Sequence, residues 1–137
     1  MAVEFLDTNV FIRYLTGDNP DQSARSLALI QQIETGDIQV TTCEGVLVEI
    51  VQVLSSRQLY NRPRSSIAST LSDIVRLRGL RLPNKVTYLR ALEIYASTNL
   101  DFVDALAVAH MERESLQTIV SFDRHFDHLP QVTRREP

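Results

Sequence analysis

Short apolar segments alternate with longer amphipathic segments along the chain, and this alternation constrains the fold more than any other feature. The short segments have the length of strands, and the longer ones repeat apolar residues at helical spacing. Strands separated by helices form parallel sheets through right-handed crossover connections. The sequence therefore predicts an α/β fold, with strands at residues 2–6, 38–40, 80–82 and 118–121 and a marginal last strand that begins near Val132.

Capping residues, prolines and glycines mark the helix boundaries. Asp18 or Asn19 can cap a helix that has Pro20 near its start and ends at Gly36. The segment Thr41-Thr42-Cys43-Glu44 has the pattern of a capping box, in which Thr41 and Glu44 are reciprocal partners. The predicted helices cover residues 8–15, 20–36, 44–56, a stretch that ends at Gly79, 86–98 and 101–114.

Apolar residues at helical spacing predict the face that each helix buries. For the last two sets, this face belongs either to the core or to an interface with a second subunit. The predicted positions are Leu27, Ile30 and Ile33; Val46, Leu47, Ile50, Val51 and Leu54; Ile67, Leu71, Ile74, Val75 and Leu77; and Val86, Leu89, Leu92, Ile94 and Tyr95.

The length of 137 residues is that of one domain, which we expect to comprise residues 1–137. A content of 44% hydrophobic and 23% charged residues is typical of a soluble globular protein. The single cysteine, Cys43, excludes an intrachain disulfide and a cysteine-based zinc site. No leader pattern or membrane-spanning run of roughly 18 apolar residues occurs, so we expect a cytoplasmic protein without membrane contact.

The net charge of −3 argues at first against a nucleic-acid partner. Four acidic residues are candidate metal ligands, however, and without their charges the balance becomes +1. Of the 14 basic residues, all except Lys85 are arginines, whose guanidinium groups bind phosphate through two hydrogen bonds. The composition therefore permits a phosphate-bearing substrate without requiring one.

Two aspartates directly follow predicted strands. Asp7 ends the first strand, and Asp123 ends the strand in TIVSFD. Ligands bind at the carboxyl ends of strands in open α/β sheets. Either aspartate could instead cap the helical turn that follows, although Thr8 and Asn9 can also cap beside Asp7. We interpret both aspartates as site residues, with Ser121 available to hydrogen-bond a neighbouring carboxylate or a metal-bound water.

Glu49 is the only charged residue between Glu44 and Arg57. Burying a carboxylate among β-branched neighbours is costly unless it has a partner or binds a metal. A solvent-facing position beside Gln52 and Ser56 accounts for Glu49 equally well. The capping box explains Glu44, which lies roughly 140° around the helix from Glu49.

Asp101 and Asp104 are three residues apart and therefore share a helix face. Asp101 falls in the first turn, where a negative charge complements the helix dipole. Asp104 precedes the apolar run at residues 105–109, so its carboxylate needs a partner. We predict Asp104 as a ligand and Asp101 as a secondary candidate.

The candidate ligands offer only oxygen atoms, and a cluster of carboxylates needs a cation to offset its repulsion. Oxygen ligands suit Mg²⁺ or Mn²⁺ rather than zinc. The histidines lack a metal-ligand spacing, and we interpret them as structural or surface residues. The candidate ligands are Asp7, Glu49, Asp104 and Asp123, and the histidines are His110, His125 and His128.

Four segments, FLDTNVFIRYL, VLVEIVQVL, DFVDALAVA and IVSFDRHFDHL, occur in this order within residues 3–132. Their order and spacing resemble the PIN-domain nuclease family, and most of all the VapC-type toxins of bacterial toxin–antitoxin pairs. The resemblance implies a three-layer α/β/α fold with a central parallel sheet of four to five short strands. It also implies that the four candidate ligands are the acidic quartet of the family.

The resemblance extends to supporting residues and to activity. Asn9 and Ser121 match supporting polar positions, with serine where many members have threonine, and Thr8 and Asp101 are further candidates. The implied activity is that of a Mg²⁺-dependent (or Mn²⁺-dependent) endoribonuclease, in which a metal-activated water hydrolyses tRNA or another structured RNA. The expected products carry 5′-phosphate and 3′-hydroxyl ends. The implied partners are a second copy of the chain and a small antitoxin, an arginine of which could pair with the carboxylates.

Arginines are the candidates for holding RNA. Arg13 lies about one helical turn beyond Asp7, and Arg57 lies in the arginine-rich middle third of the chain. We predict both as substrate-binding residues, while solvated helix faces account for most of the remaining arginines in that third, namely Arg62, Arg64, Arg76, Arg78 and Arg81.

Other functions share parts of this pattern. A haloacid-dehalogenase-type phosphatase needs a second aspartate two residues after the first, where this chain has Asn9. A response-regulator receiver domain needs paired acids after the first strand and a central phosphorylatable aspartate, which have no counterpart here. A catalytically silent RNA-binding or protein-interaction module on the same fold would not require a complete quartet. These alternatives are separated by an assay for metal-dependent RNA cleavage.

Overall fold

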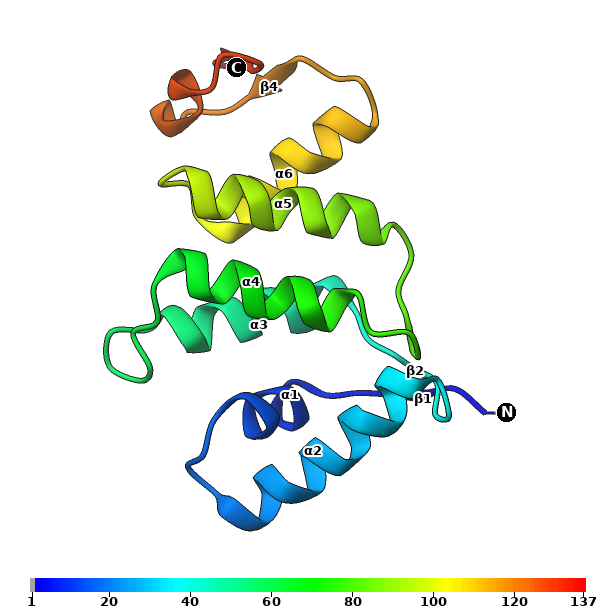
Figure 1. The fold of residues 1–137 in the computed structure, drawn as a ribbon. Coiled ribbons are helices and arrows are strands. Elements are labelled where there is room, and N and C mark those ends of the chain that lie inside the picture. The colour runs from blue at the N-terminus through cyan, green and yellow to red at the C-terminus, as the bar shows by residue number, and fades with distance from the viewer. Residues whose placement is uncertain (1) are drawn as a thin grey trace. The chain divides into compact units, whose positions relative to one another are not determined.

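The computed structural model describes residues 2–137 and has an α/β fold (Figure 1). The chain divides into two compact units, an N-terminal unit of residues 1–85 and a C-terminal unit of residues 86–137. Each unit contains its own parallel strand pairing and its own helices.

The N-terminal unit contains a three-stranded parallel sheet in the order β1-β2-β3. Glu4 pairs with Val40, and Val40 pairs in turn with Leu80. Helices connect successive strands, as the alternation in the sequence predicts. Along the chain the elements are β1 (Glu4–Phe5), α1 (Thr8–Leu15), α2 (Pro20–Thr35), β2 (Val40–Thr41), α3 (Glu44–Ser55), α4 (Arg64–Val75) and β3 (Leu80–Arg81).

The apolar stripe predicted for α3 is confirmed at every position. In α4 four of the five predicted residues are buried, which makes them core within the chain, and the fifth, Leu77, follows the helix. In α2 the prediction holds for Ile30 and Ile33 but is wrong for Leu27, which is 45% exposed. Ser26 takes the buried place instead. A small hydroxyl side chain allows α2 to lie closer to its neighbour than leucine would.

The caps of α2 are those that the sequence predicts. The Asn19 side chain accepts a hydrogen bond from the Gln22 backbone N–H at 3.0 Å, and Pro20 occupies the first turn. Gly36 ends the helix with a φ of 84°, a left-handed conformation that glycine adopts without a steric penalty.

The capping box predicted at the start of α3 is wrong. Cys43 occupies the cap position and makes no side-chain cap hydrogen bond. Thr41 belongs to β2, and its hydroxyl donates to the Arg81 carbonyl oxygen at 2.6 Å. Pairing with β3 therefore uses the side chain that the capping box would need, so the capping box no longer explains Glu44.

Gly79 permits a close approach between two backbone segments of the N-terminal unit. Its N–H donates to the Ile33 carbonyl oxygen at 2.8 Å, and its own carbonyl accepts from Val40 N–H at 2.8 Å. A Cβ atom at this position would collide with the carbonyl oxygens of Ile38 and Ile33. The end of α2 can therefore lie against the start of β3 only because residue 79 lacks a side chain.

The C-terminal unit packs two helices and a two-stranded parallel sheet. Arg90 forms two hydrogen bonds to the Glu112 carboxylate, at 2.8 and 3.0 Å, and these link α5 to α6. The rings of Tyr95 and Phe102 meet edge to face, with centroids 5.8 Å apart. Its elements are α5 (Lys85–Ser97), which begins at the last residue of the other unit, α6 (Phe102–Arg113), β4 (Thr118–Val120), the 3₁₀ helix η1 (Arg124–His128) and β5 (Thr133–Arg135).

The apolar prediction for α5 is wrong at Val86, which is 79% exposed in the first turn of the helix. The marginal last strand is confirmed as β5, one residue later than predicted. Within residues 2–137 the strands number five, three in one unit and two in the other. The expectation of a single domain for residues 1–137 stays a prediction. In the same residues, no helix combines the length and apolar character that a membrane span requires.

Candidate active-site carboxylates

Asp7 occupies the cap position of α1, but its side chain makes no cap hydrogen bond. The capping interpretation therefore does not account for the carboxylate, which is exposed. The backbone just before it is held firmly, because Leu6 N–H donates to the Thr41 carbonyl at 2.8 Å and the Thr42 hydroxyl donates to the Leu6 carbonyl at 3.0 Å. Asp7 thus projects from a fixed strand end with its carboxylate available. Of the predicted supporting neighbours, Thr8 is buried and Asn9 is exposed.

Glu49 lies on the exposed side of α3, next to the exposed Gln52. The solvent-facing interpretation is confirmed, and the idea that hydrophobic neighbours bury this carboxylate is wrong. The buried stripe of α3 lies on another face of the helix and therefore does not enclose the Glu49 carboxylate. An exposed carboxylate can still bind a cation. In this unit α1, which Asp7 precedes, packs against α3, which carries Glu49.

Asp104 lies in the first turn of α6 and is partly buried. Burial raises the pKa of its carboxyl above the ordinary value, and the negative charges of Asp123 and then Asp101 raise it further. The nearby His125 opposes these effects. The structure therefore places Asp123 and Asp101 near enough to Asp104 for their negative charges to act on its carboxyl. A bound cation would offset these charges.

Asp101 sits at the cap position of α6 and, like Asp7, makes no cap hydrogen bond with its side chain. Its charge complements the start of the helix, as the sequence predicts. Asp101 also raises the pKa of Asp104, because its negative charge lies near the Asp104 carboxyl. Asp101 thus remains a supporting candidate.

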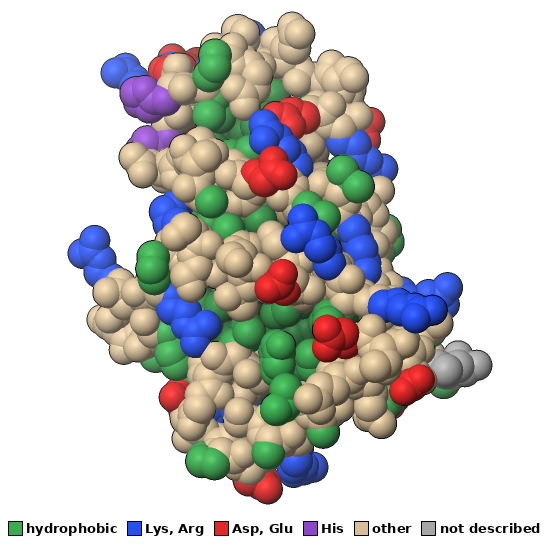
Figure 2. Space-filling model, viewed as in Figure 1, with side chains coloured by type: hydrophobic (Ala, Val, Ile, Leu, Met, Phe, Trp, Pro, Cys, Tyr) green, Lys and Arg blue, Asp and Glu red, His purple; other side chains and the backbone are tan. Residues whose placement is uncertain are grey.

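Asp123 caps η1, which confirms the capping interpretation. Its Oδ1 accepts from the His125 backbone N–H at 2.9 Å and also lies 2.9 Å from His125 Nδ1. His125 is therefore the immediate partner of a predicted ligand, which its spacing in the sequence did not reveal. Figure 2 shows histidine side chains beside basic and acidic side chains at this end of the unit, over η1.

Ser121 supports Asp123 through the backbone rather than through the carboxylate. The Asp123 N–H donates to Ser121 Oγ at 2.9 Å. The Ser121 carbonyl accepts from Arg134 Nη1 at 3.0 Å, and Arg134 Nε donates to Asp127 Oδ1 at 2.9 Å. Arg134 thereby lowers the pKa of the Asp127 carboxyl through a hydrogen bond. No sequence pattern signals this role of Arg134, whose side chain is only 13% exposed.

The donor set matches a hard divalent cation, because the four predicted ligands are carboxylates and no nitrogen or sulfur ligand is needed. Asp7 and Glu49 come from the N-terminal unit, and Asp104 and Asp123 come from the C-terminal unit. Across residues 2–137, no group of three or more histidine, cysteine, aspartate or glutamate side chains is arranged to hold a metal ion.

A groove of about 590 Å³ runs between α1 and α2 in the N-terminal unit. It begins at Asn9 and contains two arginines, Arg13 and Arg25. Arg13 Nε donates to Gln22 Oε1 at 2.9 Å, which orients the guanidinium group within the groove. The remaining lining residues are Val10, Gln22, Ser26 and Leu29, so none of the described residues that line it is acidic.

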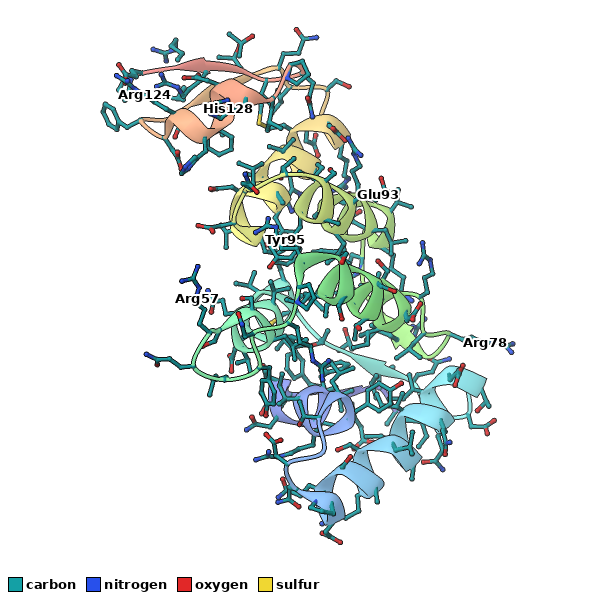
Figure 3. The ribbon with its side chains drawn as sticks, turned by 60° about the vertical axis from the view of Figure 1, so that its left-hand side comes forward. Arg57, Arg78, Glu93, Tyr95, Arg124 and His128 are labelled. Carbon is teal, nitrogen blue, oxygen red and sulfur yellow. The ribbon has the colours of Figure 1, made fainter. Side chains whose placement is uncertain are left out.

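The other arginines predicted for the middle third have mixed roles. Arg57 is exposed in the turn after α3, where Figure 3 shows it pointing away from the helices. Arg62 is structural, because its Nη2 donates to the Leu15 carbonyl at 2.7 Å. Arg76, Arg78 and Arg81 are exposed, as predicted, but they lie at the cap of α4, in the turn after it and in β3, so the prediction of helix faces is wrong for them.

Comparison with known families identifies the family to which this chain belongs. The model of the PIN domain family matches residues 5–132, which include all four predicted ligands. A comparison with curated proteins found no match. Members of the PIN domain family are generally nucleases that depend on divalent metal ions. Because the match spans most of its length, the chain belongs to the PIN domain family.

Proposed function

We propose that the chain is a Mg²⁺-dependent endoribonuclease and the toxin of a toxin–antitoxin pair. The observation that carries the proposal is the partly buried Asp104 carboxyl, whose pKa is raised by burial and by the nearby charges of Asp123 and Asp101, within a chain of a nuclease family. A carboxyl whose pKa is raised by burial and by neighbouring negative charges is typical of sites that a cation completes. The family match runs through both units, which supports a single PIN domain over residues 1–137.

Four carboxylates would hold Mg²⁺ or Mn²⁺: Asp7, Glu49, Asp104 and Asp123. When bound, such an ion lowers the pKa of a coordinated water and offsets charge that develops on the phosphate. The chain's own residues supply position. Ser121 and Arg134 fix the backbone that carries Asp123, while His125 holds one carboxylate oxygen of Asp123 in place. Thr42 fixes the backbone before Asp7 in the same manner.

Arg13 and Arg25 would bind RNA phosphates along the groove between α1 and α2. The groove adjoins Asn9, two residues after Asp7, so a backbone lying in it passes close to a proposed ligand. Guanidinium groups suit this task because each offers paired donors to phosphate oxygens. Arg57 is a further candidate contact on an exposed turn.

The remaining parts of the proposal rest on the family resemblance. The substrate would be tRNA or another structured RNA, and the products would carry 5′-phosphate and 3′-hydroxyl ends. The partners would be a second copy of the chain and a small antitoxin that inserts an arginine among the carboxylates. Such a protein would act in the cytoplasm.

The decisive experiment incubates the purified protein with total tRNA and ribosomal RNA in Mg²⁺ or Mn²⁺, with EDTA as the metal-free control. We expect cleavage in either metal and none in EDTA. Asp7→Asn and Asp123→Asn should abolish cleavage and keep the fold. Asp7 makes no cap hydrogen bond, and an asparagine at 123 can still accept from the His125 N–H.

Asp37→Asn is the matched control, since it removes an exposed carboxylate outside the proposed quartet. Full activity in Asp7→Asn or Asp123→Asn would refute the assignment of the site. RNA binding without cleavage by the wild-type protein would indicate a catalytically silent module. Release of phosphate from small monoesters, with intact RNA, would indicate a metal-dependent phosphatase.

A further inference from the structure

Phe122 exposes a large aromatic side chain to solvent in the segment that joins β4 to η1. It is 73% exposed, and among the exposed large hydrophobic residues of the described chain only Val86 is more so. An exposed valine in a first helical turn is common, whereas an exposed phenylalanine leaves a large apolar surface in water. Its position directly before Asp123 places this surface beside a proposed catalytic carboxylate.

The exposure of Phe122 does not come from a loose backbone. The residue before it is held on both sides, because Ser121 N–H donates to the Arg135 carbonyl at 2.9 Å and the Ser121 carbonyl accepts from Arg134 at 3.0 Å. The residue after it is held by the hydrogen bond from Asp123 N–H to Ser121 Oγ. The three-residue segment is therefore fixed, and it presents the ring outward.

The residues that follow Phe122 add charge suited to a nucleotide. Arg124, which Figure 3 labels, begins η1 and is exposed. His125 is also exposed, and its Nδ1 lies 2.9 Å from Asp123 Oδ1. An aromatic face stacks on any nucleobase, and a neighbouring guanidinium group binds the phosphate that follows it. Asp123 lies between the ring and the arginine in the chain. A nucleotide with its base on Phe122 would therefore have a phosphate near Asp123 and Arg124, the next two residues of the chain.

We propose that Phe122 is a stacking platform for an unpaired nucleobase adjacent to the phosphodiester that the chain cleaves. This inference rests on the proposed nuclease function and narrows its substrate to single-stranded or looped RNA. A base within a continuous duplex has no free face, so a paired substrate could not occupy the platform. Phe122 positions the substrate and takes no part in proton transfer.

A single tryptophan provides a direct probe, because the natural chain contains none. The variant Phe122→Trp is combined with Asp7→Asn so that RNA stays intact in Mg²⁺. Titration with a short single-stranded oligoribonucleotide should quench the fluorescence of that tryptophan. An abasic oligomer with the same sugar–phosphate backbone should leave the fluorescence unchanged, and so should inorganic phosphate. The matched control is Leu116→Trp in the same background, at a residue of the same unit that is 57% exposed.

Binding of the same oligoribonucleotide to Asp7→Asn variants then tests the energetic role of the ring. Phe122→Ala should weaken binding by about tenfold, within the range for loss of one base–aromatic stack. Phe122→Tyr should bind like phenylalanine, and Phe122→Leu should bind like alanine, because leucine is apolar without an aromatic face. Leu116→Ala should bind like the parent.

The outcomes separate this inference from the nuclease proposal. If the wild-type protein cleaves RNA and Phe122→Ala binds and cleaves equally well, stacking is refuted while the nuclease stands. If quenching occurs but the wild-type protein never cleaves, stacking stands and the nuclease proposal fails. A blue shift in the emission of the Phe122→Trp variant that grows with protein concentration without RNA would overturn the inference, because it marks self-association at this surface.

Discussion

The carboxylates of Asp104 and Asp123 come from a helix and a 3₁₀ turn, and they lie near enough for the charge of Asp123 to raise the pKa of Asp104. Burial of Asp104 is the larger cause, and Asp101 contributes in the same direction. The folded protein thus holds the negative charges of Asp123 and Asp101 near the Asp104 carboxyl. Such an arrangement costs stability unless a positive charge joins it, and it has measurable consequences in the absence of metal.

Asp104→Asn should stabilise the metal-free protein at neutral pH. A carboxyl whose pKa is raised by folding binds its proton more tightly in the folded state, so stability falls as the pH rises above the ordinary value of 3.8. The gain of the variant over wild-type should therefore be present at pH 7 and vanish below that ordinary value. Denaturant unfolding in EDTA at both pH values measures it, with Asp37→Asn as the control. Equal stability of Asp104→Asn and wild-type at neutral pH would contradict the raised pKa of Asp104.

Ser121→Ala should lower nuclease activity about tenfold or more, the usual cost of removing a group that orients a metal ligand. The substitution removes the oxygen that accepts from Asp123 N–H and leaves the neighbouring backbone hydrogen bonds in place. Ser121→Thr keeps the hydroxyl and should retain activity. Cleavage rates of the three proteins at saturating Mg²⁺ decide the matter. An alanine variant as active as the threonine variant would show that the hydroxyl has no such role.

Arg13→Gln and Arg25→Gln should each weaken RNA binding and reduce its dependence on salt. Each phosphate contact that is lost lowers the slope of log affinity against log salt by roughly one. The measurement is a binding titration over a series of salt concentrations with an uncleaved RNA. Arg81→Gln, which removes an exposed arginine from β3, should leave the slope unchanged. If the wild-type protein and the three variants all show the same slope, the groove does not bind RNA phosphates.

Gly79→Ala should destabilise the protein by about 1–3 kcal/mol, the range observed for overpacked positions. The new methyl group would meet the carbonyl oxygens of Ile33 and Ile38, which are backbone atoms and cannot rotate away. Gly17→Ala is the matched control, because a Cβ at that position meets no atom within 4 Å. Thermal unfolding of both variants tests the difference. A Gly79→Ala protein as stable as Gly17→Ala would contradict the close approach.

Local sequence patterns predicted the elements of this fold where one interaction dominates. The stripe of α3 and the caps of α2 follow from burial and from a single hydrogen bond, and both are confirmed. The capping box failed at Thr41 because pairing between β2 and β3, which are 40 residues apart, uses its hydroxyl. Leu27 and Val86 failed because spacing alone does not show which turns of a helix are covered by a neighbour.

The candidate site was likewise predictable from the sequence only in part. Order along the chain identified four carboxylates as candidates, and the charge of one of them, Asp123, raises the pKa of another, Asp104. Sequence suggested that Asp123 could cap the turn that follows it, but it could not show that Asp123 pairs with the His125 side chain, since that depends on the geometry of the turn. It also could not indicate Arg134, which reaches Ser121 across 13 residues of chain. Sequence left open whether Glu49 is buried or faces solvent, and the structure shows that it is exposed.

The strand end before Asp7 is fixed by Thr42 and Thr41 through backbone atoms of Leu6, and the Asp7 side chain takes no part in that anchoring. Loss of the carboxylate therefore leaves the anchoring intact. A single nucleotide change in the Asp7 codon would silence the proposed enzyme without removing the protein. The inactive protein would still bind any partner that recognises the surface around Asp7, so inactive variants would compete with active protein for that partner.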